Sequence, residues 1–191
     1  EALELFLSSN INEVNELTKR LNEHNRERQE TEKAIFESAV KTIEKEHLND
    51  NKAIIVGGEN WHHGVIGIVA SRLCEKFYKP CIMLSAENGL VKGSARSIPG
   101  FNMFSALSEC SDLLTKFGGH SQAAGLTLSL ADLESFTQKI NKYADSVLTD
   151  DDMIRKIEID CRIKPTDVSI EYARALGVLE PYGAENEKPV F

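Results

Sequence analysis

One histidine stands in a run of small residues that leaves room around its imidazole. His120 follows Gly118 and Gly119, and two alanines and a glycine come shortly after it. Paired glycines allow positive φ angles and a close approach of the backbone to a ligand. An imidazole in such a setting can hydrogen bond to a phosphate or stand next to a bound metal ion. A platform of small residues has no need of a histidine for its packing, so the pattern favours a ligand-contacting His120 over a core histidine.

A second segment, KGSARS at 92–97, combines two cations with two hydroxyl groups. The guanidinium of Arg96 can donate two parallel hydrogen bonds to phosphate oxygens. Gly93 lets a ligand backbone come close, and Ser94 and Ser97 add hydroxyl groups. Such a set suits an oxyanion backbone. An arginine at the end of a strand is equally often a plain surface residue, so the segment alone leaves both interpretations open.

A third segment, WHHG at 61–64, leads from a strand into a predicted helix. The free N–H groups of that helix, with His62 and His63 beside them, could receive a phosphate. The alternative is a tight turn in which Trp61 fills the core. All three glycine-bearing segments are expected at the ends of regular elements, where α/β sheets present their ligand crevice.

The elements that must position these segments form one α/β domain. A β-branched run at 53–56 predicts a buried strand ended by Gly57 and Gly58; apolar spacing at 65–77 predicts a helix, and 81–84 predicts a second strand. This βαβ unit implies a parallel pair. Asn88-Gly89 predicts a turn into an antiparallel strand at 90–96. Helices from Asn102 to about 114 and at 133–147, with a strand at 126–128, complete a small mixed sheet with flanking helices.

A long helix is expected to precede this domain. Asn10 and Glu13 resemble a capping box, and twelve consecutive polar residues at 22–33 interrupt the apolar stripe before it returns at Ile35. A helix with a polar middle fits a connector between two bodies. The alternative is a solvated helix packed along its own domain.

The end of the sequence predicts the start of a further domain. Three aspartates at 150–152 indicate a solvated linker. Residues 157–163 alternate as a strand does, and a short helix is expected at about 166–176. The sequence then stops in mid-element, so we expect this last domain to be incomplete and the chain to be a piece of a larger protein.

Composition limits the classes of protein and of ligand. The 191 residues are 41% hydrophobic and 27% charged, and no apolar run approaches the roughly 20 residues of a membrane span. No signal peptide is visible, so we expect a cytoplasmic protein without membrane contact. The four cysteines fit neither a zinc pattern nor a disulfide framework. The net charge is -8, yet residues 51–130 hold 7 basic and 5 acidic residues, which places an anionic ligand in the middle of the chain.

Taken together, these segments resemble the substrate-binding domain associated with the DHH family of phosphoesterases, and within it the single-strand-specific DNA exonucleases. The resemblance rests on 61–73, on GSARS at 93–97, on GGH and AAG at 118–125, and on the closing PYG and PVF, with Glu185 where a glycine is more usual. It implies four parts. These are the end of a catalytic domain (1–9), a connector helix (10–49), the DHH-associated domain (50–149), and a linker with the start of an OB-fold (150–191).

The resemblance also implies an activity: removal of nucleotides from single-stranded DNA in the 5′ to 3′ direction, during DNA repair and recombination. The family's catalytic domain holds two divalent ions, Mn²⁺ or Mg²⁺, on aspartates and an Asp-His-His motif. No Asp-His-His occurs here, so this chain should hold no metal, should be inactive alone, and should bind and position the substrate.

The resemblance assigns a role to each candidate site residue. His120 becomes the catalytic residue of this chain. Seven further residues are expected to bind substrate phosphates: Ser94, Arg96, Ser97, Gly118, Gly119, His62 and His63. The implied partners of the full-length enzyme are single-stranded DNA, a single-strand-binding protein and a helicase.

Two other functions remain open at this point. The first is a DHH-family phosphodiesterase of short RNA or cyclic dinucleotides, against which the connector and the OB-fold start argue. The second is a non-catalytic module that binds nucleic acid or protein, for which the acidic ends of the chain are the supporting feature.

Overall fold

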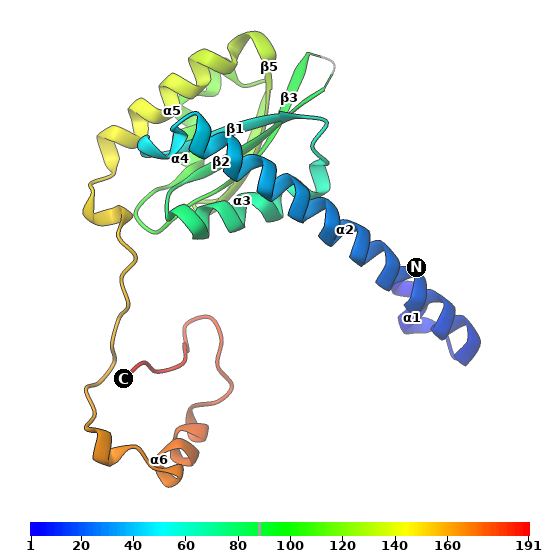
Figure 1. Ribbon diagram of the computed structural model, residues 1–191, viewed down its shortest axis with the longest axis vertical. Helices are drawn as coiled ribbons and strands as arrows, with labels where there is room; N and C mark the ends of the chain where they lie inside the picture. Colours follow the sequence, from blue (N-terminus) through cyan, green and yellow to red (C-terminus); the bar gives the residue numbers. More distant parts are fainter. Residues whose placement is uncertain (88) are drawn as a thin grey trace. The chain divides into compact units, whose positions relative to one another are not determined.

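The computed structural model describes residues 1–87 and 89–191, so Asn88, half of the predicted Asn88-Gly89 turn, lies outside the described residues. The chain divides into two compact units, Glu1–Ile154 and Arg155–Phe191. The first unit holds a mixed sheet with helices on both faces (Figure 1). It is the mixed α/β fold that the sequence predicts.

The sheet has five strands in the order β1-β2-β3-β5-β4. They are β1 (Ile54–Glu59), β2 (Cys81–Glu87), β3 (Leu90–Arg96), β4 (Lys116–Gly119) and β5 (Ala123–Ser129). The β1–β2 pair is parallel, and every other neighbouring pair is antiparallel, which confirms the predicted βαβ unit and antiparallel third strand.

Strand β1 does not end at its glycines, as the sequence suggested, but continues through them to Glu59. A Cβ atom at Gly58 would lie 2.3 Å from the indole ring of Trp61. The glycine therefore makes room for the tryptophan instead of breaking the strand. Pairing of Gly57 and Gly58 with Leu84 and Ser85 of β2 holds both glycines in the strand despite the weak strand propensity of glycine.

Helices cover the two faces of the sheet unequally. Helix α3 (His63–Phe77) packs on β2 and β3, and helix α2 (Ile11–Lys45) packs on α3 and β1. Helices α4 (Met103–Glu109) and α5 (Leu133–Val147) lie on the opposite face (Figure 1). Because β2 is covered on both faces, its residues 81–85 are buried in succession. On the side of α3, the face formed by β3, β5 and β4 stays largely open.

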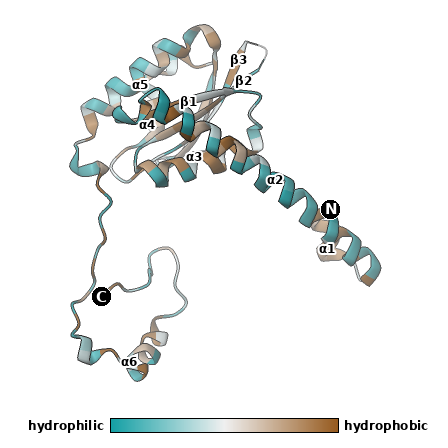
Figure 2. Ribbon diagram, viewed as in Figure 1, coloured by the Kyte–Doolittle hydropathy of each residue, from teal (hydrophilic) through white to brown (hydrophobic). Residues whose placement is uncertain are grey.

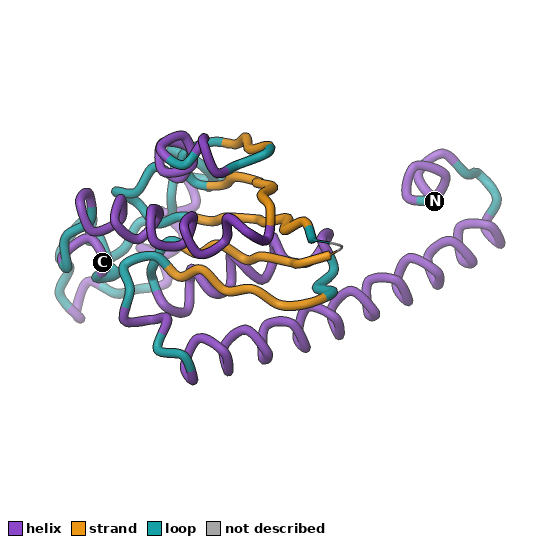
Figure 3. The backbone as a smooth tube through the Cα atoms, turned by 90° about the horizontal axis from the view of Figure 1, so that it is seen from above, coloured by secondary structure: helices purple, strands orange, loops and turns teal. Residues whose placement is uncertain are grey.

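Helix α2 begins where it was predicted to begin, and its two halves differ in their exposure to solvent. The side chain of Asn10 accepts a hydrogen bond from the amide of Asn12, but Glu13 accepts from the Ser8 hydroxyl, so no capping box forms. Residues 22–33 are mostly exposed, whereas Ile35, Ala39 and Ile43 are buried. The N-terminal part extends beyond the strands and is largely hydrophilic (Figures 2 and 3).

Two further predictions of regular structure differ from the fold. Helix α4 ends at Glu109, and a short 3-10 turn at Ser111–Leu113 replaces its predicted last turn. In the second unit, residues 157–163 form no strand. There the Asp160 amide donates to the Val190 carbonyl at 2.9 Å, but no described strand lies alongside, and Ile157 is 75% exposed. An alternating sequence forms a strand only where a neighbouring strand can pair with its backbone N–H and C=O groups.

The second unit is built from short turns and one helix. Its elements are 3-10 turns at Pro165–Asp167 and Leu176–Leu179 and helix α6 (Ile170–Ala175), which is shorter than the predicted helix at 166–176. Helix α1 (Ala2–Leu7) lies at the other end of the chain, in the first unit. Among the described residues, no helix combines the length and the apolar character that crossing a membrane requires.

Candidate functional site

The open face of the sheet carries side chains in cross-strand rows. Lys92 of β3 pairs with Thr127 of β5, which in turn pairs with Lys116 of β4. Side chains alternate between the faces of a strand, and paired residues share a face, so these three lie side by side on the open face. The next row on this face has smaller side chains: Ser94, Gly125 and Gly118.

The third row brings Arg96 and His120 to the same end of the sheet. Arg96 pairs with Ala123 across β3 and β5. The backbone N–H of His120, the residue after β4, donates to the carbonyl of Ala123 at 2.8 Å. Ala123 therefore separates the two candidate residues by two strand spacings, about 10 Å. The sequence segments 92–97 and 117–125 thus meet on adjacent strands.

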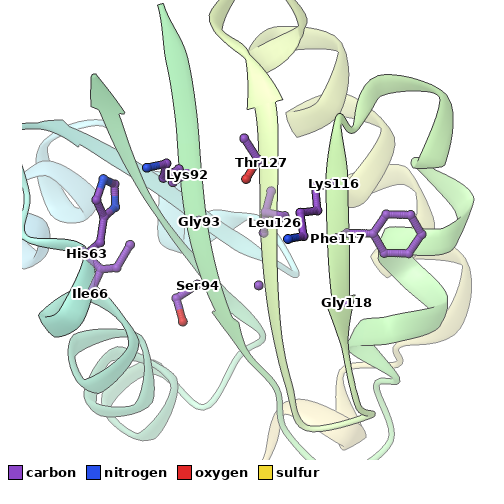
Figure 4. Close-up of a pocket in the computed structure, with 11 residues that line it drawn as sticks. His63, Ile66, Lys92, Gly93, Ser94, Lys116, Phe117, Gly118, Leu126 and Thr127 are labelled. Carbon is purple, nitrogen blue, oxygen red and sulfur yellow. The ribbon is translucent and has the colours of Figure 1, made fainter. Parts of the chain in front are cut away.

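A groove of about 520 Å³ lies over the first two rows (Figure 4). Helix α3 provides one wall with His63 and Ile66, and the strands provide the floor. The floor residues on the open face are those of the two rows, Lys92, Thr127, Lys116, Ser94, Gly125 and Gly118. Of the predicted site residues, His63, Ser94 and Gly118 line this groove, and Arg96, Ser97, Gly119, His120 and His62 do not.

The two lysine side chains of the groove have no partner among the described residues. Neither the Lys92 nor the Lys116 ammonium group forms a hydrogen bond or ion pair with a described residue, and both side chains are exposed. The Lys92 side chain leans towards α3, and that of Lys116 leans over β5 (Figure 4). One carboxylate stands at the rim, where Glu87 lies 3.6 Å from His63 Nε2.

The guanidinium of Arg96 is oriented before any ligand arrives. Its Nη1 donates to the carbonyl of Ala95 at 2.8 Å and lies 3.4 Å from Ser94 Oγ. A Cβ atom at Gly67 of α3 would lie 3.0 Å from Ser94 Oγ and 3.4 Å from Arg96 Nη2, so the glycine lets α3 lie close to both. No described carboxylate pairs with Arg96, and its charge remains available to an anion.

The two glycines before His120 differ in backbone conformation and in the space around them. Gly119 has φ +152°, and a Cβ atom there would lie 2.4 Å from the Ala123 carbonyl oxygen. Gly118 has open space around its Cα atom and forms part of the groove floor. His120 is exposed, and its imidazole has no partner within the described part of the chain.

Ser97 and His62 are engaged in local structure. The Ser97 hydroxyl donates to the Phe101 carbonyl at 2.7 Å. His62 Nδ1 accepts from the Gly64 amide at 3.1 Å, and the His62 carbonyl accepts from the amides of Val65 and Ile66. The amides of Gly64, Val65 and Ile66 are therefore used inside the first turn of α3 and are not free to receive a phosphate, as the sequence suggested they would be.

The sequence predicted a ligand crevice at the ends of regular elements, and the groove of the structure has a different position. The glycines of the three segments lie within β1, β3, β4 and β5 or in the first turn of α3, and the groove runs over the face of the sheet. Sequence reasoning assigned no role to Lys116 or Thr127. Their signal was alternation: each stands two residues from a glycine of the floor, Gly118 or Gly125, and so shares its face.

The titratable groups of the core offer no second centre. Burial raises the pKa of the Cys74 thiol to about 11, with a smaller effect of Glu75, and burial likewise raises the pKa of Cys110 to about 11. Both thiols stay protonated near neutral pH and are poor nucleophiles. Among the residues described, no three His, Cys, Asp or Glu side chains gather as a metal site would require.

Comparison with known sequences identifies the domain that carries this face. The family model described as the DHHA1 domain matches residues 50–146. The single-stranded-DNA-specific exonuclease RecJ of Bacillus subtilis is 40% identical over 190 residues, covering 98% of this chain and 24% of the relative. RecJ of Escherichia coli is 33% identical over 197 residues, covering 98% of this chain and 34% of the relative.

Solved structures agree with the sequence relatives. RecJ from Thermus thermophilus in complex with Mn²⁺ matches with a TM-score of 0.88 at 30% identity, covering 100% of this chain and 28% of that one. An exonuclease RecJ bound to manganese matches 75% of this chain and 35% of that one, with a TM-score of 0.67 at 32% identity. The chain thus spans between about a quarter and a third of the length of these relatives. It belongs to the DHHA1 domain family, and the curated relatives that match nearly all of it are RecJ exonucleases.

Proposed function

We propose that this chain is the substrate-binding part of a single-strand-specific DNA exonuclease and that the open face of its sheet holds the phosphates of the bound strand. One observation carries the proposal: Arg96, Lys92 and Lys116 lie on one sheet face around small residues, and no described carboxylate neutralises any of them. A polyanion without sequence preference is bound by such a positively charged track. The similarity to exonucleases named for single-stranded DNA supports this choice of polyanion.

Arg96 and His120 have separate tasks in this proposal. The guanidinium, held by the Ala95 carbonyl, directs its remaining N–H groups at a phosphate and fixes the position of the strand. His120 lies at the end of the same row and can donate a hydrogen bond to a phosphate oxygen on which charge develops during cleavage. Ser94, beside Arg96, adds a hydroxyl group. His120 is thus proposed as the catalytic residue of this chain, and the others bind the substrate.

The metal chemistry of such an enzyme belongs elsewhere in the parent protein. The described residues do not fit Mn²⁺ or Mg²⁺, because no three potential ligands come together. We infer that the ligands lie in a catalytic domain outside this chain, of which residues 1–9 are the end. The connector at 10–49, the DHH-associated domain at 50–149, and the linker and OB-fold start at 150–191 complete the proposed arrangement.

Binding of single-stranded and duplex DNA by the purified chain tests the proposal. We expect a labelled oligothymidylate to bind and a duplex of the same length to bind more weakly, because a flexible single strand can follow the groove between α3 and β4 more closely than a stiff duplex can. Arg96→Ala should weaken binding to the single strand, whereas Lys142→Ala, at a lysine of α5, should not. Equal affinity of Arg96→Ala and the unaltered chain would contradict the assigned role of the face. Short RNA and cyclic dinucleotides serve as competitors for the alternative activity.

A further inference from the structure

We propose that Lys92, Thr127 and Lys116 form a second phosphate subsite, so that a single strand lies along β5 with successive phosphates over successive rows. The inference rests on the proposed function and extends it from one phosphate near Arg96 to a track with a direction. The row lies four residues along β3 from Arg96, with the row of Ser94 between them. It lines the groove, which Arg96 and His120 do not.

The spacing of the rows suits an extended sugar-phosphate backbone. Residues that share a face of a strand recur every second position, which separates neighbouring rows by about 6.7 Å. This is comparable to the separation of successive phosphates in an extended single strand. The central column of the track consists of Thr127, Gly125 and Ala123 on β5, which have small side chains and leave the middle of the face low.

The cations stand on both sides of that low column. Lys92 and Lys116 belong to β3 and β4, the strands that flank β5, and the two are about 10 Å apart across it at the Cα atoms. Lysine side chains are long and flexible enough to reach an anion between them, as Lys116 already leans over β5 (Figure 4). Thr127 stands between the two lysines in their row, and its hydroxyl can donate to the same phosphate.

A nucleic-acid strand fits this face better than an acidic peptide does. The backbone groups of β3 and β5 are used by the neighbouring strands, so the face offers a peptide no partners for its own N–H and C=O groups. A sugar-phosphate backbone carries no amide groups and needs cations and hydroxyl donors, which the rows supply. The wall of Ile66 adds an apolar surface against which a sugar or base can rest.

The salt dependence of binding tests the second subsite. With the purified chain and dodecathymidylate, fluorescence anisotropy over a salt series gives the slope of log affinity against log salt concentration. We expect Lys92→Ala and Lys116→Ala each to weaken binding and to reduce the magnitude of the slope by up to about 0.7, one phosphate contact on a single strand. Lys92→Arg and Lys116→Arg should retain the slope, and Lys142→Ala is the matched loss of charge on α5. Circular dichroism confirms that each lysine variant is folded.

The outcomes separate the two proposals. If Arg96→Ala reduces affinity and slope while both lysine variants match the unaltered chain, the second subsite is wrong and the proposed function stands. If the unaltered chain fails to bind dodecathymidylate even at low salt, both are wrong. If a polyglutamate peptide binds more tightly than the oligonucleotide and depends on the same two lysines, the groove is a peptide site and the inference is overturned.

Discussion

At the scale of the residue, Gly118 and Gly119 look alike in the sequence and differ in the structure. A Cβ atom at Gly119 would meet the Ala123 carbonyl oxygen at 2.4 Å, and the backbone there has φ +152°. We expect Gly119→Ala to lower the free energy of unfolding by about 1–3 kcal/mol, because the hairpin must shift to remove the clash. Gly118→Ala, with no atom within 4 Å of the new Cβ, is the control and should change stability little. Thermal unfolding of both variants measures the difference, and equal stabilities would contradict this account.

His120 provides the second prediction at this scale, in the full-length parent enzyme. Its imidazole is exposed and unpartnered among the described residues, so His120→Ala should leave the fold intact. We expect turnover on single-stranded DNA to fall on the order of 10²-fold and affinity to change less, since a hydrogen bond from the imidazole would act mainly on the charge that develops in the transition state. Steady-state kinetics compare this variant with His47→Ala. The control removes another exposed histidine of the first unit, distant from His120 in the sequence. Normal turnover of a folded His120→Ala enzyme would remove His120 from the site.

At the scale of the element, the junction of α2 with α3 rests on a carboxylate that two arginines share. Glu32, whose side chain is 13% exposed, lies 2.9 Å from both Arg28 of α2 and Arg72 of α3. Arg72 also stacks on the ring of Phe36, with its guanidinium carbon 4.2 Å from the ring centroid. This cluster therefore fixes the polar part of α2 to α3 at the point where the buried stripe begins.

We expect Glu32→Gln to destabilise the first unit by about 1 kcal/mol, since both arginines are partly exposed and the loss is screened by water. Glu37→Gln, which loses only an exposed pair at 4.0 Å with Lys33, is the control. Amide hydrogen exchange should be faster at residues 22–33 than in β1 and β2 already in the unaltered chain, and faster still near residue 32 in Glu32→Gln. Equally slow exchange in α2 and in these strands would show a helix packed along its whole length.

The elements also show where sequence reasoning succeeds and where it stops. Short apolar runs predicted β1 and β2, apolar spacing at a period of 3.6 predicted α3 between them, and the Asn88-Gly89 turn predicted β3, because each of these signals is set by packing on one core or by a tight turn. The same reasoning ended β1 at Gly57, since the pairing of Gly57 and Gly58 with β2 joins two distant segments that no local pattern relates. It expected a strand at 157–163, where alternation exists but no described strand pairs with it.

The candidate site was partly predictable for a related physical reason. Motif residues such as Arg96 and Gly118 stand out by type, whereas Lys116 stands out only by its spacing of two residues from Gly118, in a strand of four residues that was not predicted. Which residues share a row depends on the register of β3, β5 and β4, and register follows from pairing across the sheet. The sequence therefore indicated the segments but not the groove that they form.

At the scale of the whole molecule, the chain should bind without cutting. Purified protein with Mn²⁺ or Mg²⁺ should show no metal-dependent degradation of single-stranded DNA, because no described cluster of His, Cys, Asp or Glu can hold an ion for that chemistry. Release of nucleotides from a labelled strand measures the activity, and an Arg96→Ala sample prepared in parallel reveals a contaminating nuclease, whose rate would not change. Degradation that Arg96→Ala abolishes would overturn the proposed division between binding and catalysis.

The strict alternation along β3 has a consequence for how this surface can diverge. Val91 and Ala95 are buried, and Lys92, Ser94 and Arg96 between and beside them lie on the open face of the sheet. Substitutions at the outward positions can therefore alter affinity while the core keeps its composition. Inserting or deleting one residue within β3 would exchange the two sets, placing cations in the core and apolar side chains in the groove. Homologous proteins should accordingly vary this surface by replacing residues in β3 and hold its length constant.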